Sequence, residues 1–337
     1  MIVPVQALRF LMCVTIMLHH FLQRCDSMWQ YYVDWPATFC TSLFFMLSGF
    51  VLALSSHRHQ LEQPASFIAR RYLRLMPLNL IGVLAAIIIC PPLLSQVGHI
   101  LADVFMLQSW IPDPEWYFSI NAPLWFMSDM VFCCLAFPFI IRGGRAVWFA
   151  LGAYAFALIV WGGWLCPPES ENALYYIAPW CRVMDFALGV AAWYICEYVR
   201  PRLKSHGTTI LQGTSILLAI AALAFVDYAP GSLAQVSWWW LPAIFIVISM
   251  AFPGGIFGRF LGHKFWISLG KMAFPLYVLH MPVISVVILI DAKFGLGLSI
   301  QSLFLIVLGI TYVGALMADA IIEKPASKLI KRLFRPK

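Results

Sequence analysis

Long runs of apolar residues, separated by short polar stretches, recur along the whole chain. About 20 apolar residues in a helix are enough to cross the hydrocarbon core of a bilayer. The stretch 99–111 is apolar but too short for this, so we expect it to lie at the interface or to re-enter the membrane. The pattern predicts an all-α, polytopic transmembrane helical bundle. Its ten spanning helices are expected at residues 6–23, 37–55, 77–95, 122–141, 146–165, 179–199, 210–227, 237–253, 272–291 and 300–322.

Basic residues are distributed unevenly between the two predicted sides of the membrane. With the N-terminus in the cytoplasm, the cytoplasmic loops and tail hold 18 of the 22 Lys and Arg residues, whereas the outer loops hold only Arg24 and Lys293. Cytoplasmic loops of membrane proteins are enriched in Lys and Arg, so both termini are predicted to be cytoplasmic. The 18 residues are Arg58, Arg70, Arg71, Arg74, Arg142, Arg145, Arg200, Arg202, Lys204, Arg259, Lys264, Lys271, Lys324, Lys328, Lys331, Arg332, Arg335 and Lys337.

The composition agrees with a membrane protein, since 62% of the residues are hydrophobic and only 11% are charged, against about 25% in soluble proteins. The net charge of +7 follows from the cytoplasmic basic residues, so we expect no nucleic-acid partner. No linker or repeat divides the chain, which predicts a single membrane domain over 1–337 without an appended soluble domain. The first segment lacks a small-residue cleavage site and is expected to be retained. Cys25, Cys40 and Cys166 fall near one predicted membrane face, which leaves a disulfide among them open.

The first predicted helix carries Arg9, His19 and His20 in an otherwise apolar stretch. Ionisable groups are costly in hydrocarbon and are therefore a functional hypothesis by default. Arg9 and His20 are eleven residues apart, which in a helix is about 20° past three full turns, so they share one stripe roughly 16 Å long. His19 lies about 80° off this stripe, and we expect it to play a structural or supporting role.

Other ionisable groups within predicted segments are Asp129, His280 and the pair Arg182 and Asp185. Arg182 and Asp185 are three residues apart on one helix and can pair, either as a packed ion pair or as part of a functional site. His280 lies between Pro275 and Pro282 and is more often structural in such a setting. Adjacent histidines on a helix diverge and no third ligand is evident, so no metal site is predicted.

A basic stretch, Ala69–Pro77, precedes the third predicted segment as a loop. Arg71 and Arg74 fall on one face at i,i+3. They mark the cytoplasmic side, as in any membrane protein, or they form an anion site, because the arginine fork suits phosphates. Both readings stay open at this point. Pro77 is expected in the first turn of the following helix.

Seven short motifs resemble, in order, those of the membrane acyltransferase-3 family, and the resemblance covers nearly the whole chain. The chain departs from the family at Asp129, where glutamate is usual, and at Met127, where leucine is usual. The matching residues are Arg9 with His20, Phe44-Phe45-Met46-Leu47-Ser48-Gly49-Phe50, Arg71-Tyr72-Leu73-Arg74, Pro123-Leu124-Trp125-Phe126-Met127-Ser128-Asp129, Asp185-Phe186-Ala187-Leu188-Gly189, Pro275-Leu276-Tyr277-Val278-Leu279-His280 and Ile322-Glu323-Lys324-Pro325.

The resemblance implies an O-acyltransferase of the bacterial inner membrane. It implies an acyl-CoA donor, usually acetyl-CoA, reached from the cytoplasm, and an acceptor hydroxyl on a lipid-linked or cell-surface polysaccharide. Histidine suits proton transfer at neutral pH, so we expect His20 to be the base, with a transient acyl-histidine as an alternative. The expected site residues are His20, Arg9 and Asp129 for catalysis; Arg70, Arg71 and Arg74 for the donor; and His19, Ser48, Trp125, Arg182, Asp185, His280 and Glu323 for acceptor binding or support.

Two other classes of protein remain as alternatives. A transporter or flippase would also carry intramembrane charges and helices broken at prolines such as Pro275 and Pro282. A membrane acyltransferase acting on a lipid or a small metabolite would differ only in its acceptor. The aromatic residues of 96–121 fit sugar stacking, but an interfacial aromatic belt explains them as well.

Overall fold

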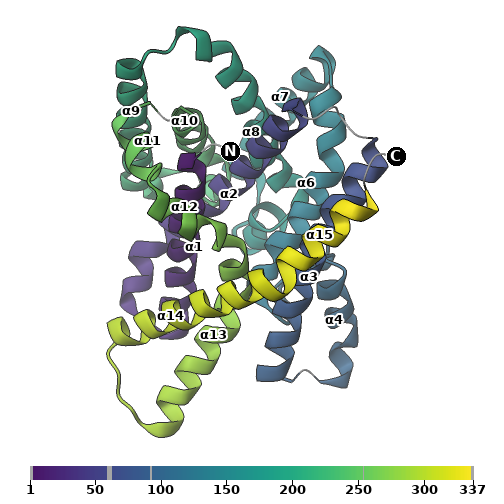
Figure 1. The fold of residues 1–337 in the computed structure, drawn as a ribbon, viewed down its shortest axis with the longest axis vertical. Helices are drawn as coiled ribbons and strands as arrows, with labels where there is room; N and C mark the ends of the chain where they lie inside the picture. The colour runs from purple at the N-terminus through teal and green to yellow at the C-terminus, as the bar shows by residue number, and fades with distance from the viewer. Residues whose placement is uncertain (1–2, 59–62, 92, 253, 335–337) are drawn as a thin grey trace. The chain divides into compact units, whose positions relative to one another are not determined.

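The computed structural model describes residues 3–58, 63–91, 93–252 and 254–334, and every regular element within these ranges is helical (Figure 1). Eight of its helical segments are long and apolar enough to cross a membrane, which confirms the predicted fold class. They correspond to the helices α1 (Val3–Arg24), α2 (Tyr31–Arg58), α3 (Pro64–Ile89), α6 (Trp125–Arg142), α7 (Arg145–Val160), α9 (Ser205–Ala224), α13 (Ala273–Phe294) and α14 (Ile300–Ala318).

The two remaining predicted segments are also helical but fall outside those eight. Helix α8 (Pro179–Val199) has the length of a spanning helix, although Arg182 and Asp185 make it less apolar. Helix α10 (Trp240–Met250) is apolar but short, with 11 residues. Five shorter helices complete the set: α4 (Val97–Val104), α5 (Pro114–Tyr117), α11 (Ile256–Leu261), α12 (Lys264–Lys271) and α15 (Lys324–Leu333).

The basic stretch before the third predicted segment is helical, which corrects the prediction of a loop. Helix α3 begins at Pro64, runs through the stretch of arginines and ends at Ile89, so Pro77 lies inside the helix and not in its first turn. Hydropathy missed this start because the first half of α3 mixes basic and apolar side chains. Residue 92 of the predicted segment 77–95 and residue 253 of the segment 237–253 lie outside the described residues, as do Arg335 and Lys337.

The apolar stretch 99–111 contains no spanning helix, as predicted. Helix α4 ends just before Met106, whose backbone is left-handed with φ of 57°, and a 3-10 turn follows at Gln108–Trp110. The nine cysteines all lie among the described residues and none is in a disulfide, so Cys25, Cys40 and Cys166 are not bridged.

The chain divides into two compact units, each built from three stretches of sequence. The first unit contains Met1–Met12, Trp35–Leu61 and Phe132–Lys271, and the second contains Cys13–Asp34, Glu62–Val131 and Met272–Lys337. Helices α1, α2 and α6 contribute residues to both units. The single membrane domain stays a prediction.

Two glycines bring α2 and α8 into backbone contact in the first unit. A Cβ at Gly49 would overlap the carbonyl oxygen of Phe186, and a Cβ at Gly189 would overlap that of Met46. Each helix therefore supplies the glycine that the other needs. Backbones can approach this closely only where no side chain intervenes, a device common among packed membrane helices.

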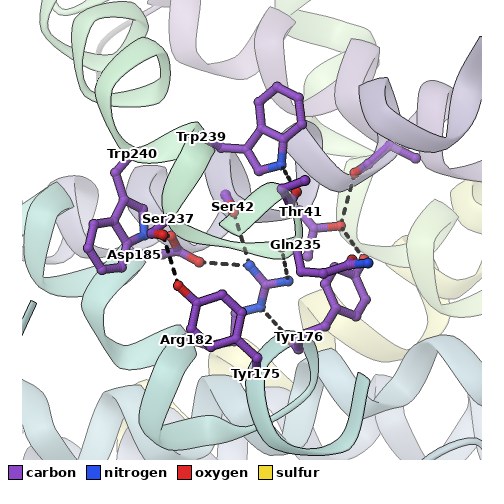
Figure 2. A network of polar contacts seen from close by, with 12 residues as sticks. Thr41, Ser42, Tyr175, Tyr176, Arg182, Asp185, Gln235, Ser237, Trp239 and Trp240 are labelled. Atoms are coloured by element: carbon purple, nitrogen blue, oxygen red, sulfur yellow. Dashed lines mark hydrogen bonds and ion pairs between the residues drawn. The ribbon is translucent and has the colours of Figure 1, made fainter. Parts of the chain in front are cut away.

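A buried ion pair lies in the same unit. Arg182 Nη1 donates to Asp185 Oδ2 at 2.9 Å, and both side chains are fully buried. The same nitrogen donates to Ser42 Oγ at 3.0 Å, while Trp240 Nε1 donates to Asp185 Oδ1 at 2.7 Å (Figure 2). The predicted pairing of Arg182 with Asp185 is thus confirmed.

The rest of the Arg182 fork is used as well. Its Nε donates to the carbonyl of Tyr176 at 2.6 Å and its Nη2 to that of Gln235 at 3.4 Å (Figure 2). The guanidinium also lies over the Tyr176 ring, 4.5 Å from its centroid. A charge removed from water is tolerated only when it is paired and hydrogen-bonded in this way.

The second unit is centred on α13, which packs against α14 and α3. Helix α14, a π-helical turn at Asp319–Glu323 and α15 form one continuous helical path, yellow in Figure 1, whose end lies along α3. Lys324 pairs with Asp319 at 2.7 Å across the π turn. Asp319 is therefore ion-paired.

Substitution of Gly49 or Gly189 by alanine is expected to destabilise the first unit. Overpacking costs about 1–3 kcal/mol where side chains adjust, and here the obstacle is backbone. The thermal unfolding midpoint of the purified protein in detergent should fall for both variants. Gly213→Ala in α9 is the matched control, because a Cβ there meets no heavy atom within 4 Å. Equal midpoints for all three variants would contradict the close approach.

Arg182→Gln is expected to destabilise the protein far more than Arg200→Gln. The first change leaves Asp185 buried and unpaired, which costs about 3–5 kcal/mol. Arg200 pairs with Glu197 at 3.0 Å, but their side chains are 48% and 39% exposed, so that pair is worth about 0–1 kcal/mol. The same unfolding measurement compares the two, and similar shifts for both would refute the structural weight given to the buried pair.

Candidate functional site

Three histidines gather in the second unit, two from the end of α1 and one from α13. The rings of His20 and His280 are stacked, with centroids 5.4 Å apart and planes inclined by 25°. The ring of His19 lies 4.9 Å from that of His20. Nearer the start of each helix, Cys13 of α1 also contacts α13, because its thiol donates to the carbonyl of Ala273 at 3.4 Å.

A proline determines how α13 is held near His280. Val278 would normally accept a hydrogen bond from the residue four positions later, but that residue is Pro282, which has no N–H. Asn121 Nδ2 donates to the Val278 carbonyl at 3.3 Å and to the Gly82 carbonyl of α3 at 3.1 Å. The Asn121 amide thus satisfies the freed carbonyl and joins α13 to α3.

Two further features fix the same region of α13. Tyr277 donates its hydroxyl proton to the carbonyl of Pro123, at 2.7 Å, just before α6. Gly82 lies where α3 meets α13, and a Cβ there would be 2.6 Å from a methyl group of Val278. His280 therefore stands on a helix segment that is held from two sides.

The tautomer of His280 follows from its hydrogen bond. Its Nδ1 lies 2.5 Å from the carbonyl oxygen of Tyr277, which can only accept, so Nδ1 carries a hydrogen. In the neutral ring, Nε2 then holds the lone pair. Within the described part of the chain this Nε2 is buried and has no partner.

His20 also has an open nitrogen. Its ring interacts with the side chain of Gln23, yet Nδ1 is buried and has no partner among the described residues. His19 differs, because its Nδ1 lies 2.8 Å from Asp34 Oδ1 and is thereby occupied. His20 and His280, whose rings are stacked, thus each have a buried nitrogen without a partner among the described residues, whereas Nδ1 of His19 is already paired.

The predicted donor-binding arginines lie together in the first half of α3. Arg70 and Arg71 are half-buried, and Arg71 lies over the Phe67 ring, 5.4 Å from its centroid. Arg74 is 56% exposed and lies 3.9 Å from Glu323 in the π turn. At this distance and exposure the contact is weak, so most of the positive charge of Arg74 stays available.

The other predicted site residues are divided between the two units. Arg9 lies on α1 in the first unit, and Ser48, also in the first unit, donates to the carbonyl of Phe44 at 2.8 Å. Arg182 and Asp185 form the buried network described above. Asp129 and Trp125 are buried on α6 in the second unit.

Several buried polar residues of the second unit were not expected from the sequence. Asp103 accepts hydrogen bonds from the Ser119 hydroxyl at 2.6 Å and from the Ile120 N–H at 3.1 Å. Burial raises the pKa of Asp103 to about 6, against the opposing effect of these two bonds. Gln108 is fully buried, and its amide has no partner within the described residues. The only signal was their position in a short apolar stretch.

This pair of histidines can accept a hydrogen bond or take up a proton at a position buried from bulk water. Nδ1 of His20 and Nε2 of His280 are buried and have no partner among the described residues, and in the neutral ring of His280 the Nε2 atom holds a lone pair. Imidazole is the side chain best suited to take up a proton near neutral pH.

Comparison with known proteins agrees with this chemistry. A family model described as "Acyltransferase domain" matches residues 4–319. The chain is 26% identical over 326 residues to acyltransferase MdmB of Streptomyces mycarofaciens, and the match covers 86% of this chain and 81% of that relative. No solved structure matches the chain. Because the family model covers nearly the whole sequence, the chain belongs to the acyltransferase-3 family and is a multi-pass membrane acyltransferase.

Proposed function

We propose that the protein transfers an acyl group, most simply acetyl, from cytoplasmic acyl-CoA to a hydroxyl of a cell-surface or lipid-linked polysaccharide at the bacterial inner membrane. The observation that carries the proposal is the buried Nδ1 of His20, which has no partner among the described residues, in a chain of the acyltransferase-3 family. A donor thioester is already activated, so the protein has only to supply a base and to hold the two substrates.

In the proposed reaction His20 takes the proton from the acceptor hydroxyl. The oxygen then forms a bond to the acyl carbon, the carbon–sulfur bond breaks, and its electron pair goes to sulfur. The thiolate of coenzyme A finally receives the proton from His20. An ester and free coenzyme A result, and no oxidant, reductant or metal is needed for the balance.

The arginines of α3 suit the phosphates of the donor. Arg70, Arg71 and Arg74 are near one another on a helix whose start is predicted to be cytoplasmic, and the arginine fork binds phosphate oxygens well. Arg9 and Asp129 are proposed to assist the reaction, by stabilising negative charge and by orienting the base.

Two partly exposed aromatic rings favour a sugar acceptor. Trp110 and Phe118 of the segment before α6 are 39% and 41% exposed, and such rings can stack on sugars.

A transporter is less well supported, because α13 is continuous through Pro282 and the family is one of acyltransferases.

His20→Ala is expected to lower acyl transfer by roughly a hundredfold or more, since a general base contributes about 10²–10⁴ in rate. The measurement is acetylation of the surface glycan by mass spectrometry, in cells that express each variant at equal level. His19→Ala is the matched control and should be much milder, because the Nδ1 of His19 is occupied by Asp34. Full activity of the His20 variant would contradict the assignment of His20 as the base.

Arg71→Ala is expected to raise the KM for acyl-CoA by roughly tenfold or more, with little effect on acceptor use, because a hydrogen bond to a charged group is worth about 1.5–3 kcal/mol. The assay is coenzyme A release by the purified protein over a range of acetyl-CoA concentrations. Arg145→Ala removes an equally basic but exposed residue at the start of α7. If both variants behave alike, the arginines of α3 only mark the topology.

A further inference from the structure

His280 carries a buried nitrogen that the proposed reaction leaves unused. Its Nδ1–H donates to the Tyr277 carbonyl and so orients the ring. Its Nε2 has a lone pair, is buried, and has no partner in the described part of the chain. A buried acceptor without a donor is unfavourable, so a group from outside the chain is the natural partner.

The nature of that group follows from the neighbouring ring. His20 lies stacked beside His280, with centroids 5.4 Å apart and planes close to parallel at 25°. A hydroxyl has a single hydrogen and cannot donate to both rings at once. The hydroxyl that gives its proton to His20 therefore leaves His280 free to accept from another donor close by.

We propose that Nε2 of His280 accepts a hydrogen bond from a second hydroxyl of the acceptor, on a carbon next to the one that is acylated. This inference rests on the proposed role of His20. It makes His280 a residue that binds the acceptor, and it identifies the acceptor as a compound with neighbouring hydroxyls, such as a sugar, and not an isolated alcohol.

The arrangement would also provide selectivity. A site built to hydrogen-bond a substrate hydroxyl rejects analogues without it strongly, because its own buried polar group is then left unpaired. The fixed tautomer of His280 contributes to this, since its Nε2 can only accept while the ring is neutral. An alcohol without a neighbouring hydroxyl would leave this nitrogen empty.

Two substitutions separate the function of Nε2 from that of Nδ1. Asparagine can place an amide N–H where Nδ1 lies and so preserve the bond to the Tyr277 carbonyl, but it has nothing at the position of Nε2. Glutamine reaches the position of Nε2 with an oxygen that accepts hydrogen bonds, but it has nothing at Nδ1. A purely structural histidine is thus better replaced by asparagine, and an acceptor-binding one by glutamine.

The experiment measures the rate at which labelled acetyl groups enter the surface glycan of cells expressing full-length wild type, His280→Asn, His280→Gln or His20→Ala at equal level. We expect His280→Gln to stay within about tenfold of wild type and His280→Asn to fall by roughly a hundredfold. The pH profile of His280→Gln should match that of wild type, because the base is unchanged. Activity of His280→Gln equal to or below that of His280→Asn overturns the proposal.

The His20→Ala arm keeps the two ideas apart. If that variant remains active, the assignment of the base fails and the role of His280 fails with it. If it is inactive while glutamine at position 280 is no better than asparagine, only the role of His280 fails. Detergent extraction and size-exclusion chromatography of each variant show that the compared proteins are folded.

Discussion

Polar groups buried in a membrane protein must find their partners within the chain, because lipid offers none. This constraint explains most of the unusual contacts in the structure. Pro282 deprives the Val278 carbonyl of its normal donor, and the Asn121 amide replaces it. In the first unit the same requirement surrounds Arg182 with one carboxylate, one hydroxyl and two carbonyls.

Against this background, the few unsatisfied groups stand out. The Nδ1 of His20 and the Nε2 of His280 are both buried and have no partner in the described part of the chain. The ring of His280 is held by the Tyr277 carbonyl, and its helix is held by Asn121 and Tyr277. Rigid support around open polar atoms is typical of a site prepared for a substrate.

The sequence predicted the fold class well because hydropathy reports directly on the length of apolar helices. It fails where helices are not uniformly apolar, as in the first half of α3, where the basic residues predict a loop. It also singled out His20 and His280 as ionisable groups within apolar segments but could not tell how they meet. The stacking of His20 on His280 joins residues 260 positions apart, and no local pattern encodes such a contact.

The motifs shared with the family separate into different physical tasks. Gly49 and Gly189 allow two backbones to touch, and Asp185 neutralises a buried arginine. Asp103 and Gln108 belong to none of these motifs, although both are buried polar residues of the second unit. Membership of a motif therefore does not by itself identify the buried polar residues of the second unit.

The hydrogen bonds of Asn121 affect how loss-of-function mutations are interpreted. Its single side chain holds α3 and α13 together through two carbonyls, and α13 carries His280 two residues further on. Losing that amide would loosen the histidine without removing any atom that reacts. A mutant screen that measures only activity would not distinguish such a supporting residue from one that takes part in the reaction. The number of residues essential for activity therefore overstates the size of the catalytic site.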